Sequence, residues 1–196
     1  NDGAINGADH VYLYVGMRRG GNDIYSIDVT NRYQPRLRWI IQGGNGDYAE
    51  LGQTWSTVNV ETLKLGGNDK TVLIFGAGYD ENQDTATERT ADTVGRGVFI
   101  VDADTGAKLW SAGPTGSGAN LILPEMQYSM PARVKPIDID GNGYIDRLYI
   151  GDMGGQIFRF DITESETSSD LSTLITGGRI ADFALDASAA DARRFY

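Results

Sequence analysis

Short apolar segments, closed by a glycine or an aspartate, recur along the chain and set its organisation. Each repeat consists of an apolar segment ending in glycine, a turn, and a second apolar segment ending in aspartate. β-Branched and aromatic residues fill these segments, which favours strands over helices. The three copies comprise residues 11–16 with 24–28, 72–76 with 97–102, and 148–151 with 157–161.

Further strand-like stretches extend these pairs toward sheets of four strands. Residues 55–60 and 132–137 precede the second and third copies, and a tryptophan, Trp39 or Trp110, follows two of the copies. Repeated four-stranded sheets at this spacing predict an all-β fold, a β-propeller with quinoprotein-like blades. An antiparallel sandwich is the alternative, and the repeated glycine and aspartate favour the propeller.

The predicted blades divide the chain as one incomplete propeller domain. Because a propeller closes with about four to eight blades, we expect a segment of a longer protein. We expect a helical turn at 187–194 within the last region. The predicted regions are a partial blade at 1–44, a blade at 55–112, a blade at 132–176 with a weak fourth strand near 173–176, and the start of the next blade at 179–196.

The long connections fall on one face of the predicted propeller. Residues 43–54, 79–96 and 113–130 join strands on that face, whereas residues 138–146 lie on the other. Long loops on a rigid scaffold are common binding sites, although their polar composition equally suits solvated decoration.

Composition narrows the class of function. The 196 residues carry a formal net charge of −10, which argues against nucleic acid as a partner and suits cation binding. No apolar run reaches the roughly 18 residues of a membrane span. Cysteine is absent, so disulfides, thiolate metal sites and a cysteine nucleophile are excluded.

The stretch from Asp138 to Asp146 has the ligand spacing of a calcium loop. Asp138, Asp140, Asn142 and Asp146 stand at loop positions 1, 3, 5 and 9, and Tyr144 offers its backbone carbonyl at position 7. Calcium takes 6–8 oxygen ligands, and this spacing brings alternate side chains to one point. We therefore predict a Ca²⁺ site, with a metal-free acidic turn as the alternative.

The loop departs from an EF-hand in two respects. Position 12 is Tyr149, where an EF-hand has a bidentate glutamate, while Gly143 at position 6 does fit. Pro136 and the β-branched and aromatic residues around the loop favour strands rather than helices. The pattern therefore predicts a calcium-clamped connection between two strands.

Several motifs together resemble the C-terminal propeller domain of the PilC/PilY type IV pilus proteins. They lie at residues 15–21, 52–57, 76–80 and 144–161, and the resemblance covers about residues 11–195. It implies a calcium-binding propeller in which Asp138, Asp140, Asn142, Asp146 and the Tyr144 carbonyl hold the ion.

The same resemblance implies a role in pilus assembly against retraction, in twitching and in surface adhesion. The implied partners are pilin or minor pilins, with a host surface contacted through other parts of the full protein. The implied location is the pilus at the cell surface, reached by export through the periplasm.

An enzyme is the first alternative. Residues 102–110 resemble the blade motif of quinone-dependent alcohol dehydrogenases, whose turn and tryptophan are structural. Those enzymes use an adjacent cysteine pair, which this chain lacks, and His10 is the one histidine available as a base. We therefore expect no catalysis.

An integrin-type calcium-binding adhesive domain is the second alternative. Such propellers repeat the aspartate-rich loop in several blades, whereas the full pattern occurs here once. The acidic segment at residues 80–84 lacks the glycine and the alternation, so we interpret it as a solvated loop.

Other charged residues invite a functional interpretation. We expect Asp28, Asp102 and Asp161, each at the end of a predicted strand, to cap the following turns. Asp152 is either a turn cap or a further ligand, and we favour the cap. Arg18 and Arg19 form a small basic spot on an acidic molecule, which suggests an acidic edge of a pilin or pseudopilin as a partner.

Overall fold

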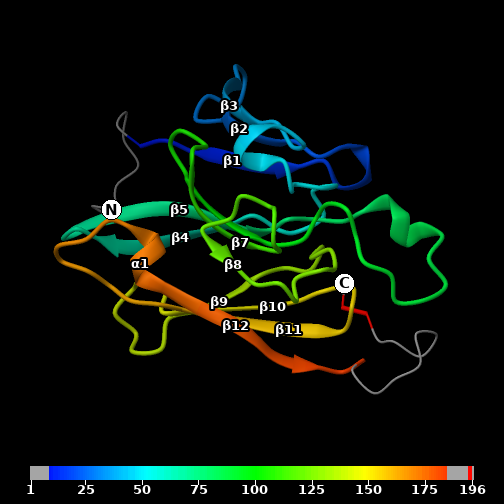
Figure 1. Ribbon diagram of the computed structural model, residues 1–196. Helices are drawn as coiled ribbons and strands as arrows, with labels where there is room; N and C mark the ends of the chain where they lie inside the picture. Colours follow the sequence, from blue (N-terminus) through cyan, green and yellow to red (C-terminus); the bar gives the residue numbers. More distant parts are fainter. Residues whose placement is uncertain (1–8, 185–193, 196) are drawn as a thin grey trace.

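The computed structural model describes residues 9–184 and 194–195, and these residues form three stacked, largely antiparallel sheets (Figure 1). Consecutive strands pair within each sheet. The first sheet comprises β1 (Tyr12–Gly16), β2 (Ile24–Asp28) and β3 (Arg36–Ile41); the second comprises β4 (Asn59–Leu65), β5 (Asn68–Gly76), β6 (Val98–Asp102), β7 (Lys108–Gly113) and the short parallel β8 (Leu121–Ile122); the third comprises β9 (Lys135–Ile137), β10 (Arg147–Gly151), β11 (Gln156–Ile162) and β12 (Ile175–Asp182).

Helical structure in the described residues is limited to single turns. They are η1 (Arg18–Gly20), η2 (Gly46–Tyr48), η3 (Glu81–Asp84) and α1 (Leu171–Leu174). Across residues 9–184 and 194–195, no helix has the length and apolar character needed to cross a membrane.

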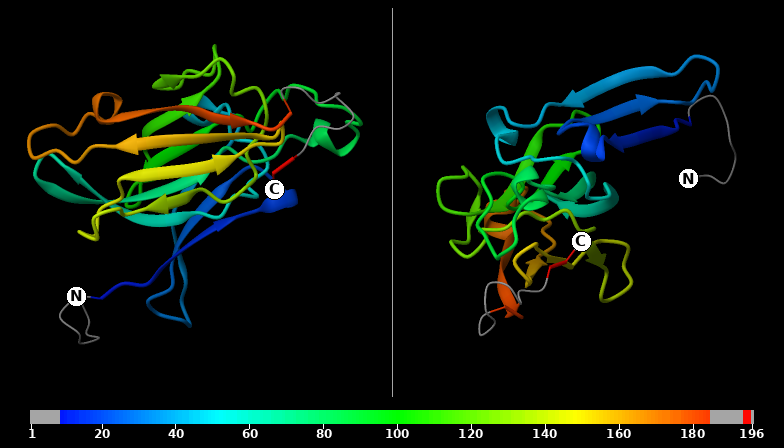
Figure 2. Two further views of the ribbon diagram at one scale, coloured as in Figure 1. Left: turned by 90° about the horizontal axis from the view of Figure 1, so that it is seen from below. Right: turned by 90° about the vertical axis from the view of Figure 1, so that its right-hand side faces the viewer.

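The sheets fan out as successive blades of a β-propeller and do not close into a ring (Figure 2). The all-β propeller predicted from the repeats is confirmed, as is its being incomplete. The predicted assignment of residues to blades stays a prediction. One strand, β12, has different bounds in the structure from those predicted.

The last strand of the third sheet runs further than the sequence predicts. β12 ends at Asp182, so residues 179–182 pair with β11 and do not begin a further blade. Gly177 is part of this strand because it packs against Phe160, where an added Cβ would lie 2.5 Å from the ring. The expected helical turn at 187–194 falls almost entirely outside the described residues.

The second sheet is buried on both faces because its apolar residues alternate in direction. On β5, Val72 and Ile74 face the third sheet, whereas Leu73 and Phe75 face the first. β6 repeats the arrangement, with alternate side chains in the two clusters. Successive strand residues point to opposite faces, so a continuous apolar run serves two interfaces.

A tryptophan joins the second and third sheets. Trp110 on β7 is fully buried and meets Phe160 of β11 edge to face, with ring centroids 5.6 Å apart. The tryptophan of the repeat therefore packs between blades, as the sequence predicts.

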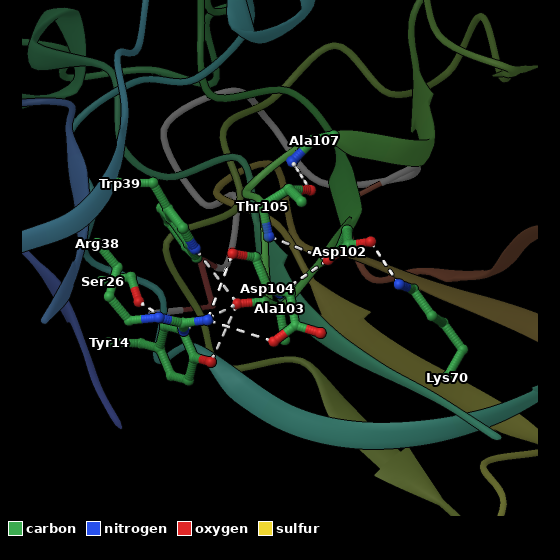
Figure 3. Close-up of polar contacts among 10 residues, drawn as sticks. All are labelled: Tyr14, Ser26, Arg38, Trp39, Lys70, Asp102, Ala103, Asp104, Thr105 and Ala107. Atoms are coloured by element: carbon green, nitrogen blue, oxygen red, sulfur yellow. Dashed lines mark hydrogen bonds and ion pairs between the residues drawn. The ribbon is translucent and has the colours of Figure 1, made fainter. Parts of the chain in front are cut away.

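The backbone carbonyl of Ala103 joins the second sheet to the first (Figure 3). It accepts hydrogen bonds from Tyr14 Oη at 3.1 Å, Trp39 Nε1 at 3.3 Å and Arg38 Nη1 at 3.5 Å. Gly106, in the same turn, has a φ of 73° and lies so close to Trp39 that an added Cβ would be 2.9 Å from its ring. The turn therefore requires glycine at this position.

The aspartates at the strand ends behave in two ways. Asp102 Oδ1 accepts from the backbone N–H groups of Asp104 at 2.7 Å and Thr105 at 3.0 Å, and Asp28 accepts from Thr30 at 2.9 Å. These two cap turns as predicted. For Asp161 the prediction is wrong, because its carboxylate pairs with arginines of the two central strands of the third sheet, Arg147 and Arg159.

Truncating a valine in the double-faced sheet tests the role of this burial. Val98→Ala removes two methyl groups from a fully buried position on β6, whereas Val60→Ala removes the same groups from a half-exposed position on β4. We expect Val98→Ala to lower the free energy of unfolding by about 2 kcal/mol, from lost transfer energy and a residual cavity. Val60→Ala should cost well under half of that in urea titrations. Equal losses would contradict the packing described.

Candidate metal centre

Residues 138–146 form the connection between β9 and β10, so the loop lies between strands as its flanking residues predict. Asp138, Asp140 and Asp146 each offer a carboxylate oxygen within 4.8 Å of the other two. Asp138 and Asp146 are half-buried and Asp140 is exposed. The arrangement is one in which a single metal ion could contact all three carboxylates.

Two glycines allow the loop to wrap around Asp138. The N–H of Gly141 donates to Asp138 Oδ1 at 2.7 Å, and the N–H of Gly143 donates to Oδ2 at 2.8 Å. Gly141 and Gly143 have φ values of 78° and 94°, in the left-handed region. The hydrogen bond from Gly143 is the main reason that the pKa of Asp138 lies below its ordinary value, so this carboxylate is ionised at neutral pH.

The remaining polar side chains of the loop accept hydrogen bonds from its backbone N–H groups. Asp146 Oδ2 accepts from the Ile139 N–H at 2.6 Å, and Asn142 Oδ1 accepts from the Tyr144 N–H at 2.8 Å. Asp140 Oδ1 accepts from the Asn142 N–H at 3.1 Å. The three carboxylates at positions 1, 3 and 9 therefore lie close together, while the complete ligand set stays a prediction.

The loop is attached to the neighbouring sheet as well as to its own. Tyr144 Oη donates to Asp69 of the β4–β5 hairpin at 2.7 Å, and Lys64 Nζ lies 5.5 Å from the Tyr144 ring centroid. The N–H of Ile145, a buried residue, donates to Thr62 O at 3.2 Å. A change in the loop is therefore felt directly at the junction of two blades.

Glu164 is a neighbour of the loop that sequence reasoning missed. It lies in the β11–β12 connection, and its Oε1 accepts a hydrogen bond from Asn142 Nδ2 at 2.5 Å. Glu164 stands 22 residues from Asn142 in the sequence, so no local spacing could connect them. Only the fold reveals this contact, because β11 ends at Ile162 and brings Glu164 beside the loop.

The acidic segment at residues 80–84 is more ordered than a solvated loop. Asp80 is buried, and its carboxylate accepts from the N–H groups of Asn82, Thr93 and Val94 at 2.7–3.1 Å. Asp84 pairs with Arg19. Asp80 therefore closes the long 79–96 connection, and the interpretation as a solvated loop is wrong for this residue.

Asp152 acts as a turn cap, the role favoured from sequence. Its Oδ1 accepts from the N–H groups of Gly154 at 3.0 Å and Gln156 at 2.8 Å, and its Oδ2 accepts from Gln156 Nε2 at 2.8 Å. The side chain is fully buried, and this burial raises the pKa of Asp152 to about 7 despite the three donors. His10, by contrast, is exposed and stacks on Tyr12.

Known proteins resemble this chain in sequence and in fold. No family model matches it. The type IV pilus biogenesis factor PilY1 of Pseudomonas aeruginosa strain PAO1 is 28% identical over 172 residues, which is 86% of this chain. A PilY1 homologue from Xylella fastidiosa strain Temecula1 is 25% identical over 83% of the chain. The crystal structure of the P. aeruginosa PilY1 C-terminal domain superposes with a TM-score of 0.67 over 93% of the chain, at 22% identity.

The chain is homologous to PilY1. It has the fold of the PilY1 C-terminal domain, as the resemblance implied. The chain spans 13% of the length of PilY1 and 36% of the crystallised C-terminal domain. The PilY1 relatives are biogenesis factors, and no enzyme family is indicated.

The buried carboxyl of Asp152 predicts a pH dependence of stability. The folded protein holds this proton up to about pH 7, whereas an unfolded aspartate releases it near pH ~4. The free energy of unfolding should therefore fall as pH rises between these values, by at most about 1.4 kcal/mol per pH unit. Denaturant titrations of wild type and Asp152→Asn at several pH values measure the contribution of Asp152 to this pH dependence. An identical pH dependence in both proteins would show that Asp152 does not titrate in this range.

Proposed function

We propose that this chain is the calcium-binding part of a propeller domain that supports type IV pilus biogenesis. The observation that carries the proposal is the meeting of three carboxylates within one nine-residue loop. The fold shared with the PilY1 C-terminal domain supplies the context. The proposed ligands are Asp138, Asp140, Asn142, Asp146 and the Tyr144 carbonyl.

The chemistry of the donor set favours calcium over softer metals. All the proposed ligands are oxygens, and the loop contains neither histidine nor cysteine. Calcium accepts 6–8 oxygens at flexible distances, whereas Mg²⁺ requires a tighter octahedral shell. One Ca²⁺ would reduce the formal charge of the three carboxylates from −3 to −1. Glu164 or water would complete the shell.

The ion would act as a conformational clamp. Bound calcium replaces carboxylate repulsion by attraction, and so holds β9 and β10 at a fixed separation. Because Tyr144 and Ile145 attach the loop to the second sheet, the clamp extends to the interface between two blades. Nothing in this role requires a reacting substrate, so the function is binding and scaffolding.

The PilY1 homology supports a proposal for the cellular role. Pilus components, pilin or minor pilins, are the proposed partners, and the proposed location is the pilus at the cell surface, after export through the periplasm. Calcium occupancy would adjust the balance of pilus extension against retraction, and with it twitching and adhesion. Contact with a host surface would involve other parts of the full protein.

A calcium titration tests the ligand assignment. We expect one site with a dissociation constant of about 10⁻⁶–10⁻³ M by calorimetry, weakly contested by Mg²⁺. Asp140→Asn should weaken binding at least ~10-fold, since it removes one of three charges that hold the ion. Glu164→Gln should weaken it by less. Asp170→Asn removes the same charge from an exposed helix cap outside the loop and should leave affinity unchanged.

A wild-type affinity in Asp140→Asn would show that calcium binds elsewhere. An equal loss of affinity in Asp140→Asn and Asp170→Asn would show that general acidity, rather than the loop, sets the affinity. An unaltered dissociation constant in Glu164→Gln would show that Glu164 is not a ligand, and the assignment of the other ligands would not be affected.

The role in the pilus is tested in cells that produce the full protein. Asp140→Asn should reduce surface pili and twitching while protein abundance stays near wild type, because the loop loses its ion and not its place in the fold. In a strain that also cannot retract its pili, the variant should again show surface pili. Pili that stay absent there, with normal abundance of the variant, would mean that the loop is needed for assembly itself.

A further inference from the structure

A cavity of about 360 Å³ lies among arginine and aromatic side chains near the strand ends opposite the metal loop. The order of residues along β5 separates the two sites. Asp69 near its start contacts the metal loop, and Tyr79 in the cavity wall follows its end at Gly76. Nine strand residues span roughly 30 Å at ~3.3 Å each, so the cavity is separate from the metal loop. Its principal walls are Arg18, Arg19, Trp55, Tyr79 and Arg133.

Arg18 is held at the cavity by an unusual backbone conformation. Among the described residues, it is the one non-glycine with a positive φ, 52°. Its N–H donates to Thr54 O at 3.2 Å, and the Thr54 hydroxyl accepts from the N–H of Met17 at 2.7 Å. The guanidinium lies 5.6 Å from the centroid of Trp55. A conformation of this kind has a free-energy cost and is often found at ligand sites.

Arg133 is oriented by an amide. Its Nε donates to Asn59 Oδ1 at 2.9 Å, and buried Asn59 in turn donates to the carbonyls of Ile74 and Val134, at 3.1 Å each. The guanidinium is exposed on its other side. Glu61 is a carboxyl near Arg133, and burial raises the pKa of Glu61 while Arg133 and Lys135 lower it.

Arg19 and Tyr79 form the opposite wall and are already engaged. Arg19 pairs with both oxygens of Asp84, at 2.6 and 2.9 Å, and Tyr79 Oη donates to the same carboxylate at 2.8 Å. This arrangement fixes the wall and leaves Arg18 and Arg133 as the cations facing an incoming ligand. Both sit on a molecule whose net charge is −10, so the local sign opposes the overall one.

A second cavity of about 480 Å³ adjoins the first and shares Arg19 and Tyr79 with it. Its other walls are largely polar and glycine-rich, and include Gly20, Gly21, Asn22, Gly52 and Gln53. Asp80 and Glu81 also line it, and both carboxylates already accept hydrogen bonds from neighbouring groups, so the acidic side chains of a ligand belong in the first cavity. A cationic, aromatic compartment next to a compartment rich in backbone groups suits an extended chain better than a compact small molecule.

We propose that the arginine–aromatic cavity binds an acidic peptide segment, with carboxylates at Arg18 and Arg133 and an apolar side chain against Trp55. A guanidinium binds a carboxylate through two parallel hydrogen bonds, which favours an acid over a neutral amide. Trp55 is half-buried and has its Nε1 satisfied by Gln53 at 3.1 Å, so its exposed face is available for apolar contact. This binding does not depend on the proposed metal role.

Fluorescence anisotropy with defined peptides tests the proposal on the whole purified protein. The probe is a labelled hexapeptide that alternates glutamate and phenylalanine; glutamine–phenylalanine and lysine–phenylalanine versions and free benzoate are competitors. The acidic peptide should bind at least ~10-fold more tightly than the glutamine peptide, because two guanidiniums contact charged groups. Binding should persist in a calcium chelator, which separates it from the metal site.

Matched substitutions locate the site. Arg18→Gln with Arg133→Gln should weaken the acidic peptide at least ~10-fold, while Arg32→Gln with Arg36→Gln, which removes the same charge from an exposed region, should leave it unchanged. If the double variant unfolds, Arg18→Gln alone can replace it. The Arg18 side chain donates no hydrogen bond within the described residues, so this change should leave the fold intact. It should weaken binding at least ~3-fold.

Three results would overturn the proposal. Equal binding of the acidic and glutamine peptides would make the cavity merely apolar. Equal loss in both double variants would reduce the effect to overall charge. Competition by benzoate at the concentrations at which the peptide itself competes would indicate a small carboxylate in place of a peptide.

Discussion

The burial of the second sheet between its two neighbours is the constraint on which this structure depends. Alternate residues of β5 and β6 enter opposite apolar clusters, so residues 72–76 and 98–101 are buried on both faces of the sheet. Such a sheet is stable only while both neighbours stay in place, because exposing either face returns a full row of apolar side chains to solvent. The repeated turns and tryptophans hold the neighbouring sheets in place. The Ala103 carbonyl accepts hydrogen bonds from three side chains of the first sheet, and Trp110 packs against Phe160 of the third.

Stacking the sheets in this way divides the connections between two ends, and each end gathers a different chemistry. In Figure 1 the connection at residues 138–146 lies at the end with α1, and the connection at residues 77–97 lies at the opposite end. The first end holds the carboxylates of the metal loop, and the second holds the arginine–aromatic cavity. The length of β5 separates the two ends, so the arginines of the cavity lie too far away to neutralise the carboxylates that would hold an ion.

The sequence predicts correctly those features that are determined by residues close together along the chain. The alternation of residues 72–76 predicts a strand, and the loop at 138–146 predicts converging oxygens, because both are set within a few residues. It could not place Glu164 beside Asn142 or Arg133 beside Asn59, since these pairs are joined by the return of strands. The same limit explains Asp161, whose arginine partner on β10 outcompetes the local turn. The packing of Gly177 on Phe160 within β12 is a further contact that depends on the fold and not on neighbours along the chain.

The position of the metal loop determines how far a bound ion could act. Binding to the folded state alone stabilises that state by RT ln(1 + [L]/Kd), about 2.7 kcal/mol at a ligand concentration of 100 times Kd. If the loop touched its own hairpin alone, this free energy would oppose fraying of β9 and β10 and nothing else. Tyr144 and Ile145, however, contact the hairpin of the second sheet, so separating the two blades also breaks contacts that an ordered loop maintains. Calcium at this site would therefore oppose blade separation, which converts a local ligand into a control on the shape of the whole domain.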